Sequence, residues 1–151
     1  MKIVIAGAGE VGSHLAKLLS GEDQDIIIVD ENRERLATLD ANYNLLTVVG
    51  KPTSFFSLRD AFAGSADLFI AVTPYESTNI VACGIAKSLG AKTTVARVSH
   101  YGFMDPDNTP TMRRMGVDRL IYPEYLASKE IITALEHSCV PIYVGFAEVC
   151  G

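Results

Sequence analysis

A glycine-rich turn follows the first apolar run of the chain, residues 2–6 (KIVIA). Its spacing is Gly-x-Gly-x-x-Gly, and its residues are Gly7, Ala8, Gly9, Glu10, Val11 and Gly12. Between a strand and a helix, the first glycine permits a tight turn, the second lets backbone approach a pyrophosphate, and the third lets helix and strand pack closely. The helix start adds free N–H groups and a positive dipole end. The pattern predicts a phosphate-binding turn, and the alternative is that the glycines serve only the turn.

An acidic residue, Asp30, ends the second apolar run, residues 25–29 (DIIIV), 18 positions after Gly12. A carboxylate there can accept hydrogen bonds from the hydroxyls of an adenosine ribose, and it repels a 2′-phosphate. The site therefore favours NAD over NADP, and Glu31 is included in it. Arg33 and Arg35 follow. We expect both to be solvated helix charges that weaken the exclusion of a 2′-phosphate only slightly.

Thr73 and Pro74 follow the fourth apolar run, residues 67–72. The carboxyl ends of parallel strands meet at the edge of the sheet that binds ligands, so the Thr73 hydroxyl is a candidate ligand group there and Pro74 would stiffen the turn. Ser77 or Thr78 is expected to cap the helix that follows.

Arg97 lies near the end of the fifth run, residues 93–98, where we expect side chains to be buried. A guanidinium is seldom buried without a partner. A phosphate is the favoured partner, and the carboxylate of Asp67 is the alternative. Glu124 follows Pro123 after the sixth run. It suits the start of a helix, and it could also face a ligand or a cation.

Little in the sequence supports catalysis. The three histidines do not form a metal set, and only His100, close to Arg97, makes a pairing typical of a catalytic site. The three cysteines include no Cys-x-x-Cys pair, which disfavours a disulfide framework and a zinc site. No Ser/His/Asp order, His-Glu-x-x-His motif or P-loop lysine is present. We therefore expect no enzymatic activity and no metal ligands.

Composition narrows the class of protein further. The chain has 151 residues, 48% hydrophobic and 21% charged, with a net charge of −5. This length fits one domain with its own core. The acidic balance gives no attraction to nucleic acid or to anionic lipid. No apolar run approaches the roughly 20 residues that span a bilayer. We expect a cytoplasmic protein that does not insert into the membrane.

Apolar runs alternate with segments of helical spacing. Strands are expected over residues 2–6, 25–29, 45–49, 67–72, 93–98 and 118–122. Helices are expected from residue 11 to about residue 19, and over 31–39, 54–63, 77–89 and 124–137, with a loop at 101–110 and one helical turn at 111–115. This alternation predicts an α/β fold, a Rossmann-like doubly wound parallel sheet of six strands with helices on both faces.

The domain boundary is expected near residue 138. Residues 139–151 are apolar and rich in β-forming residues, and they have no partner in a six-stranded sheet. We interpret them as the start of a further C-terminal module; the alternative is an extra edge strand.

Four segments together resemble the RCK family (also called KTN or TrkA-N), regulatory domains of potassium channels and transporters. They are IVIAGAGEVG with Asp30, ADLFIAVT followed by Glu76 and Asn79, AKSLGAKTTVARV, and GVDRLIYPEYLASKEI. The resemblance covers residues 1–134. It implies an adenine nucleotide in the crevice, with NAD(H) favoured and ATP/ADP or AMP as alternatives. It also implies that occupancy gates a TrkH-like membrane subunit that translocates potassium, with this domain on the inner face of the membrane.

The resemblance also implies roles for particular residues. Gly7, Gly9 and Gly12 would approach phosphates, Asp30 would hold a ribose, Thr73 would lie over the cofactor, Arg97 would contact phosphate, and Glu124 would lie near a subunit boundary. Residues 124–137 would form the helix through which a homodimer or larger homo-oligomer assembles. The stretch Gly50-Lys51-Pro52-Thr53 departs from the family's Gly-Asp-x-Thr. Lys51 could favour a more phosphorylated ligand or merely alter a loop.

Two other functions remain open. One is the cofactor domain of an NAD-dependent dehydrogenase, with Arg97 and His100 as parts of its site. The other is a methyltransferase that uses S-adenosylmethionine, because glycine turns and ribose-binding acids recur in that class.

Overall fold

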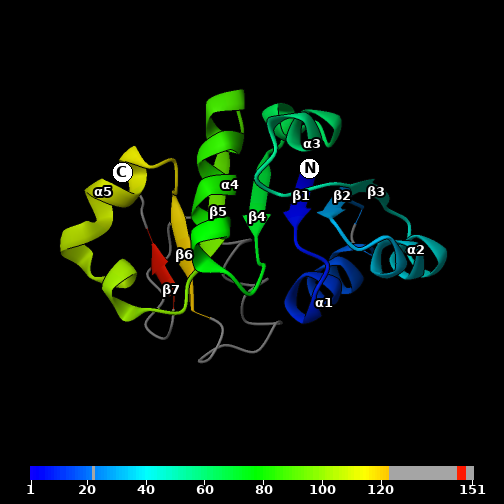
Figure 1. The fold of residues 1–151 in the computed structure, drawn as a ribbon, viewed down its shortest axis with the longest axis horizontal. Helices are drawn as coiled ribbons and strands as arrows, with labels where there is room; N and C mark the ends of the chain where they lie inside the picture. The colour runs from blue at the N-terminus through cyan, green and yellow to red at the C-terminus, as the bar shows by residue number, and fades with distance from the viewer. Residues whose placement is uncertain (22, 123–145, 149–151) are drawn as a thin grey trace.

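A single mixed sheet forms the centre of the molecule, in the strand order β3-β2-β1-β4-β5-β6-β7 (Figure 1). The computed structural model describes residues 1–21, 23–122 and 146–148. Its first six strands are β1 (Lys2–Ala6), β2 (Asp25–Asp30), β3 (Leu46–Val49), β4 (Leu68–Ala71), β5 (Thr93–Arg97) and β6 (Arg119–Ile121). All six pair in parallel. Their order, 3-2-1-4-5-6, is that of a doubly wound dinucleotide-binding fold, so the predicted fold class is confirmed.

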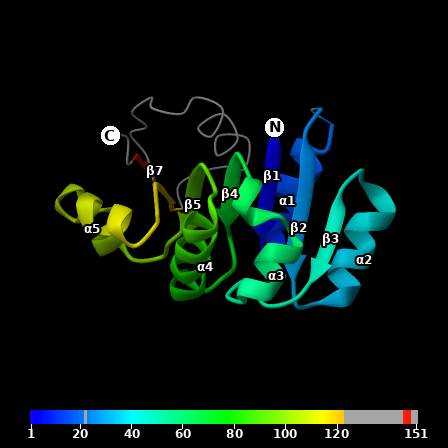
Figure 2. The same ribbon diagram turned by 90° about the horizontal axis from the view of Figure 1, so that it is seen from above.

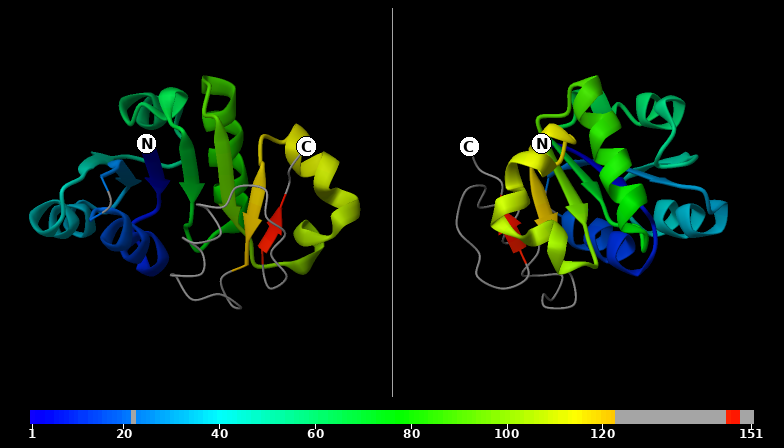
Figure 3. Two further views of the ribbon diagram at one scale, coloured as in Figure 1. Left: turned by 180° about the vertical axis from the view of Figure 1, so that it is seen from behind. Right: turned by 60° about the vertical axis from the view of Figure 1, so that its left-hand side comes forward.

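A seventh strand, β7 (Phe146–Glu148), lies antiparallel to β6, with Ala147 opposite Leu120 (Figure 3). The six predicted parallel strands are thus joined by one antiparallel strand at the edge of the sheet. An open sheet edge offers unpaired N–H and C=O groups to any strand that reaches it. Of the two interpretations of the tail, the extra edge strand is the one that holds for these three residues. The domain boundary near residue 138 stays a prediction.

Helices cover both faces of the sheet (Figure 2). Successive side chains of a strand point to opposite faces. Ile3 and Ile5 of β1 therefore pack with Leu15 and Leu36, which belong to α1 (Glu10–Leu19) and α2 (Arg33–Asn42). Val4 lies in the opposite cluster. That cluster includes residues of α3 (Phe55–Asp60), α4 (Glu76–Leu89) and α5 (Thr109–Arg114).

Three short 3₁₀ helices complete the described elements: η1 (Ala63–Ser65), η2 (Tyr101–Met104) and η3 (Pro106–Asn108). The last two occupy the segment 101–110 that was expected to be a loop. The helical turn predicted at residues 111–115 is part of α5, which begins two residues earlier. The helix predicted over residues 124–137 lies outside the described residues.

Capping bears on the starts of α2 and α4. The helix predicted from residue 31 begins at Arg33, because the side chain of Asn32 accepts hydrogen bonds from the amides of Glu34 and Arg35. The helix predicted from residue 77 begins at Glu76, and its N-cap residue makes no side-chain cap. Ser77 and Thr78 were expected to cap this helix, and that expectation is wrong because both lie within it.

Candidate functional site

The glycine turn needs two of its glycines for its own shape. Gly7 has φ +112°, a conformation that L side chains rarely adopt, and its N–H donates to the carbonyl oxygen of Val29 at 2.8 Å. A Cβ on Gly12 would lie 1.7 Å from the carbonyl oxygen of Gly7. The start of α1 can therefore pack against the turn only without a side chain at residue 12, as the motif predicts.

Gly9 differs from both. Its φ is −74°, and in the described part of the chain the only atom within 4 Å of a Cβ built on it, its chain neighbours aside, is Nη1 of Arg35, at 4.0 Å. Ser13 stabilises the turn from the side of α1: its N–H donates to the carbonyl oxygen of Gly9 at 2.9 Å, and its hydroxyl donates to the carbonyl oxygen of Ala8 at 2.8 Å. The outer face of Gly9 is open, beside first-turn N–H groups that have no partner within α1. These are the features that backbone contact with a phosphate requires.

The carboxylate of Asp30 joins two successive turns. Oδ2 accepts the N–H of Ala8 and Oδ1 accepts the N–H of Asn32, both at 2.7 Å. Its backbone oxygen accepts the N–H of Gly50 at 3.0 Å. A carboxylate offers about four acceptor positions. Asp30 can therefore hold the turn and still accept hydroxyl groups, as the predicted ribose contact demands.

Asn79 and Thr73 form a buried hydrogen-bonded pair at the end of β4. Oδ1 of Asn79 accepts from the Thr73 hydroxyl at 2.7 Å and from its N–H at 2.9 Å. Nδ2 donates to the backbone oxygens of Thr73 at 3.0 Å and of Arg97 at 2.9 Å. Asn79 is 0% exposed. The Thr73 hydroxyl thus stabilises the turn, and Asn79 is a positioning residue that we considered only within the resemblance.

Arg97 is half-buried, not buried as expected. In the described part of the chain its guanidinium has no hydrogen bond or ion pair with protein. Asp67 lies at the opposite edge of the sheet, where it accepts from the N–H of Lys2 at 2.8 Å and pairs with Lys92 at 3.0 Å. The alternative pairing of Asp67 with Arg97 is therefore wrong, and the phosphate contact of Arg97 stays a prediction.

His100 does not act with Arg97, because Glu76 holds it. Oε2 of Glu76 accepts the N–H of Ser99 at 2.8 Å and the N–H of His100 at 3.1 Å, and Oε1 pairs with Nδ1 of the His100 ring. Partial burial alone would raise the pKa of Glu76, but the hydrogen bonds from Ser99 and His100 outweigh it and lower that pKa. Glu76 therefore fixes the loop after β5 to the start of α4. An acid at a helix start is favoured by the dipole, which is a sequence signal for Glu76 in addition to the family resemblance.

The remaining candidate residues are described by their exposure alone. Glu10, Glu31 and Pro74 are exposed, and Val11 is half-buried. Lys51 is exposed just after β3. Glu124 lies outside the described residues.

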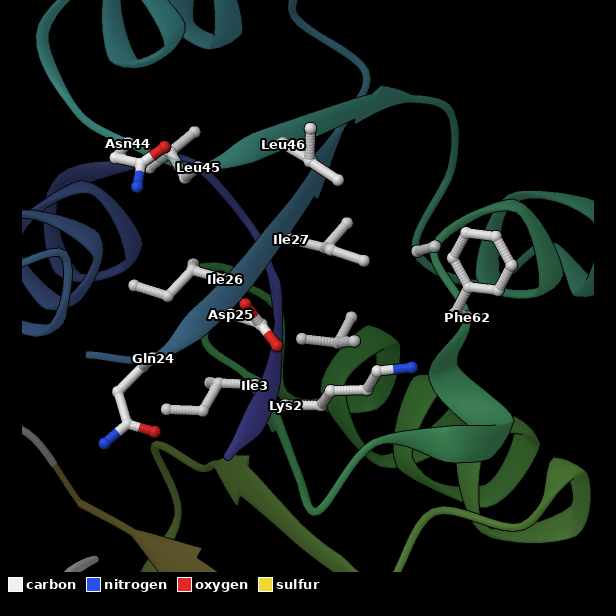
Figure 4. Close-up of a pocket in the computed structure, with 12 residues that line it drawn as sticks. Lys2, Ile3, Gln24, Asp25, Ile26, Ile27, Asn44, Leu45, Leu46 and Phe62 are labelled. Carbon is white, nitrogen blue, oxygen red and sulfur yellow. The ribbon is translucent and has the colours of Figure 1, made fainter. Parts of the chain in front are cut away.

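A hollow of about 310 Å³ lies at the other edge of the sheet (Figure 4). It is lined by residues 2–4, 24–27 and 44–46, with Ala61 and Phe62. These are the amino ends of β1, β2 and β3, whereas the glycine turn follows the carboxyl end of β1. The hollow is therefore separate from the candidate site.

Among residues 1–21, 23–122 and 146–148, no group of three or more His, Cys, Asp or Glu side chains is arranged to hold a metal ion. Over the same residues, no helix combines the length and apolar character that crossing a membrane requires.

The strand order and the glycine turn define the chain as a Rossmann-type α/β domain. Residues 3–123 match the model of the TrkA-N domain, and the chain belongs to that family. It is 41% identical over 133 residues to the Trk system potassium uptake protein TrkA of Haemophilus influenzae. That match covers 87% of this chain and 29% of the relative, so the chain spans about a third or less of the protein that it resembles.

Solved structures share the fold. The TrkA-N domain of the Escherichia coli inner membrane protein YbaL superposes with a TM-score of 0.70 at 18% identity, over 92% of this chain and 96% of that one. The GsuK channel bound to NAD gives a TM-score of 0.64 at 21% identity, over 79% of this chain and 21% of that one. A further structure of GsuK is bound to ADP.

Proposed function

We propose that residues 1–138 form a regulatory domain that binds an adenine nucleotide and controls potassium uptake. The ligand would be NAD(H), with ATP/ADP and AMP as alternatives. The observation that carries the proposal is the open backbone of Gly9 beside the Asp30 carboxylate, which itself fastens the glycine turn through the N–H of Ala8.

The residues present suit such a ligand. Phosphates would meet the backbone of Gly9 and the start of α1, where N–H groups and the helix dipole favour negative charge. Asp30 would hold the ribose hydroxyls and disfavour a 2′-phosphate. The Arg97 guanidinium, which lacks a protein partner among the described residues, would contact a phosphate, and the Thr73 turn would bound the crevice.

The loop after β5 bears on the dehydrogenase alternative. That alternative rested on Arg97 and His100 acting together, and in the structure the His100 ring pairs with Glu76 through Nδ1. A domain of this kind would act by binding nucleotide better in one arrangement than in another, and that difference in affinity limits the bias it can impose. No turnover is expected when the protein is incubated with NAD and a panel of alcohols and hydroxy acids. Sustained turnover would refute the regulatory proposal.

The potassium partner is proposed from the relatives. A protein named Trk system potassium uptake protein is 41% identical over 133 residues. By analogy this domain would lie in the cytoplasm, on the inner face of the membrane, against a TrkH-like translocating subunit. A homodimer or larger homo-oligomer would form through residues 124–137. In vesicles that hold the full-length protein and its membrane subunit, nucleotide should change potassium flux, and Asp30→Ala should abolish that response.

Identification of the ligand is the direct experiment. The protein is purified without added nucleotide and then denatured. Any small molecule that is released is identified by mass spectrometry. Melting temperature is then measured with NAD⁺, NADH, ATP, ADP, AMP and S-adenosylmethionine. A ligand that binds only the folded state raises the melting temperature. Stabilisation by adenine nucleotides alone is expected, and stabilisation by S-adenosylmethionine alone would indicate the methyltransferase.

A further inference from the structure

Among the described residues, Arg35 is the one side chain that lies against the open face of Gly9. Its Nη1 is 4.0 Å from the point where a Cβ of Gly9 would stand. The sequence suggested only a solvated helix charge. Exposed helix arginines commonly pair with acids three or four residues away. Glu31 lies four residues before Arg35 but ahead of the start of α2, and within the described residues the guanidinium of Arg35 makes no ion pair or hydrogen bond with it or with any other group.

A continuous set of hydrogen bonds fixes the place of Arg35. The Ala8 N–H donates to Asp30, and Asp30 accepts the Asn32 N–H, both at 2.7 Å. The Asn32 side chain accepts the N–H groups of Glu34 at 3.0 Å and of Arg35 at 3.1 Å. The first turn of α2 is thus held to the glycine turn by the acid that would bind the ribose. This linkage places the Cα of Arg35 within reach of Gly9.

The local charge explains why a cation is useful there. Asp30 contributes a negative charge beside the glycine turn, and Glu10 in the first turn of α1 contributes another. Glu10 and Arg35 line the same groove between α1 and α2. A phosphate that approached Gly9 without Arg35 would face two carboxylates, and the glycine turn itself would oppose them with only the partial charge of the helix start. A guanidinium donates through a planar fork that matches phosphate oxygens.

From this placement we infer that Arg35 binds the phosphate that contacts Gly9, and so makes the site selective for adenosine that carries a 5′-phosphate or diphosphate. The inference rests on the proposed function and deepens it. It assigns Arg35 to the phosphate bonded to the 5′ side of the nucleoside, not to a 2′-phosphate, because Gly9 is where the backbone approaches the pyrophosphate.

The test compares Arg35→Gln with Arg33→Gln. Arg33 is a matched control, because it is also an exposed arginine in the first turn of α2 and no contact with Gly9 is seen for it. Affinities for adenosine, ADP, NAD⁺ and NADP⁺ are measured by isothermal titration calorimetry on the whole chain. Hydrogen bonds to a charged group are worth about 1.5–3 kcal/mol, which predicts a loss of about tenfold or more for ADP and NAD⁺ in Arg35→Gln. Adenosine affinity should change by less than about twofold, and Arg33→Gln should match wild type.

Each other outcome has a stated meaning. Equal losses for adenosine and ADP, or equal losses in the two variants, would overturn the role of Arg35 and leave the proposed function standing. A loss confined to NADP⁺ would overturn the assignment by moving Arg35 to the 2′ position. Wild-type protein that binds none of the four ligands, and none of NADH, ATP and AMP, would overturn the proposed function together with this inference. Because the guanidinium has no protein partner in the described part of the chain, the melting temperature without ligand should be the same in both variants, which separates a binding defect from misfolding.

Discussion

Replacing Gly12 by alanine would place a methyl carbon 1.7 Å from the carbonyl oxygen of Gly7 and 2.8 Å from its carbonyl carbon. Both are backbone atoms, so no side chain can rotate away and α1 must shift from the turn. Overpacking of this kind costs typically 1–3 kcal/mol, and a backbone obstacle favours about 3 kcal/mol. Alanine returns about 1 kcal/mol through its higher helix propensity. The expected net loss is about 2 kcal/mol of unfolding free energy.

Gly9→Ala is the matched control in the same turn. Its φ of −74° suits alanine, and a Cβ there meets only the end of the Arg35 side chain at 4.0 Å. Stability should therefore be unchanged or raised by up to about 1 kcal/mol. The methyl group would nevertheless occupy the place where a phosphate meets the backbone. The affinity for ADP should fall by about tenfold or more, the loss of one or two hydrogen bonds to a charged group.

Urea unfolding measures the free energy of unfolding of each variant, and calorimetric titration measures its affinity for ADP. The chain contains no tryptophan, so unfolding is followed by far-ultraviolet circular dichroism. The two variants should show opposite patterns: Gly12→Ala should be less stable than wild type, whereas Gly9→Ala should be stable but impaired in ADP binding. Gly12→Ala as stable as wild type would refute the packing argument. Gly9→Ala with wild-type affinity would refute the assignment of its open face to phosphate.

Three further substitutions probe the side chains that join the loops. Asp30→Ala should weaken ADP binding by about tenfold or more in calorimetric titration, because ribose and turn contacts are both lost; Glu31→Ala is the control, and unchanged affinity in Asp30→Ala would remove the ribose assignment. Asn79→Ala deletes four hydrogen bonds and leaves their buried partners unsatisfied, so urea unfolding should show a loss of about 3 kcal/mol of unfolding free energy. A loss no larger than that of exposed Ser77→Ala would contradict the buried network. Glu76 has its pKa lowered from 4.5 in the folded protein, so its contribution to stability is present above the unfolded pKa and is lost as pH falls through the folded one. The melting temperature of Glu76→Gln should therefore lie further below wild type at pH 7 than at pH 3, and an equal difference at both pH values would show that the charge is not the cause.

The sheet was predictable because its central strands are buried on both faces. Such strands appear in sequence as continuous β-branched runs, as residues 2–6 and 25–29 do. The end of each run then indicates the sheet edge to which the next residue belongs. Asp30 was placed correctly by that logic alone. The same logic, applied more strictly, excludes Asp67 as a partner of Arg97, since one begins its strand and the other ends its own.

The contacts between loops were less accessible. Strand order predicts that Glu76, Ser99 and His100 lie at the carboxyl edge of the sheet, but it does not predict the direction of a side chain in a loop. His100 follows Arg97 closely in sequence, yet its ring turns to Glu76 on α4. Arg35 was interpreted as a solvated charge because helical spacing shows only which acids lie on its own helix. Its neighbour, Gly9, lies on a different turn, 26 residues earlier in the chain.

The carboxyl edge is held together by two separate groups of side-chain hydrogen bonds. Asp30 connects the turns after β1 and β2, whereas Asn79 and Glu76 connect the segments after β4 and β5. Within the described residues no side-chain hydrogen bond joins one group to the other. A nucleotide that contacts Asp30 and Arg97 at once would therefore connect parts of the edge that the protein joins through the β1–β4 ladder and the packing of Thr73 on Gly7. The binding energy of the nucleotide could therefore favour one placement of these two groups relative to each other over another.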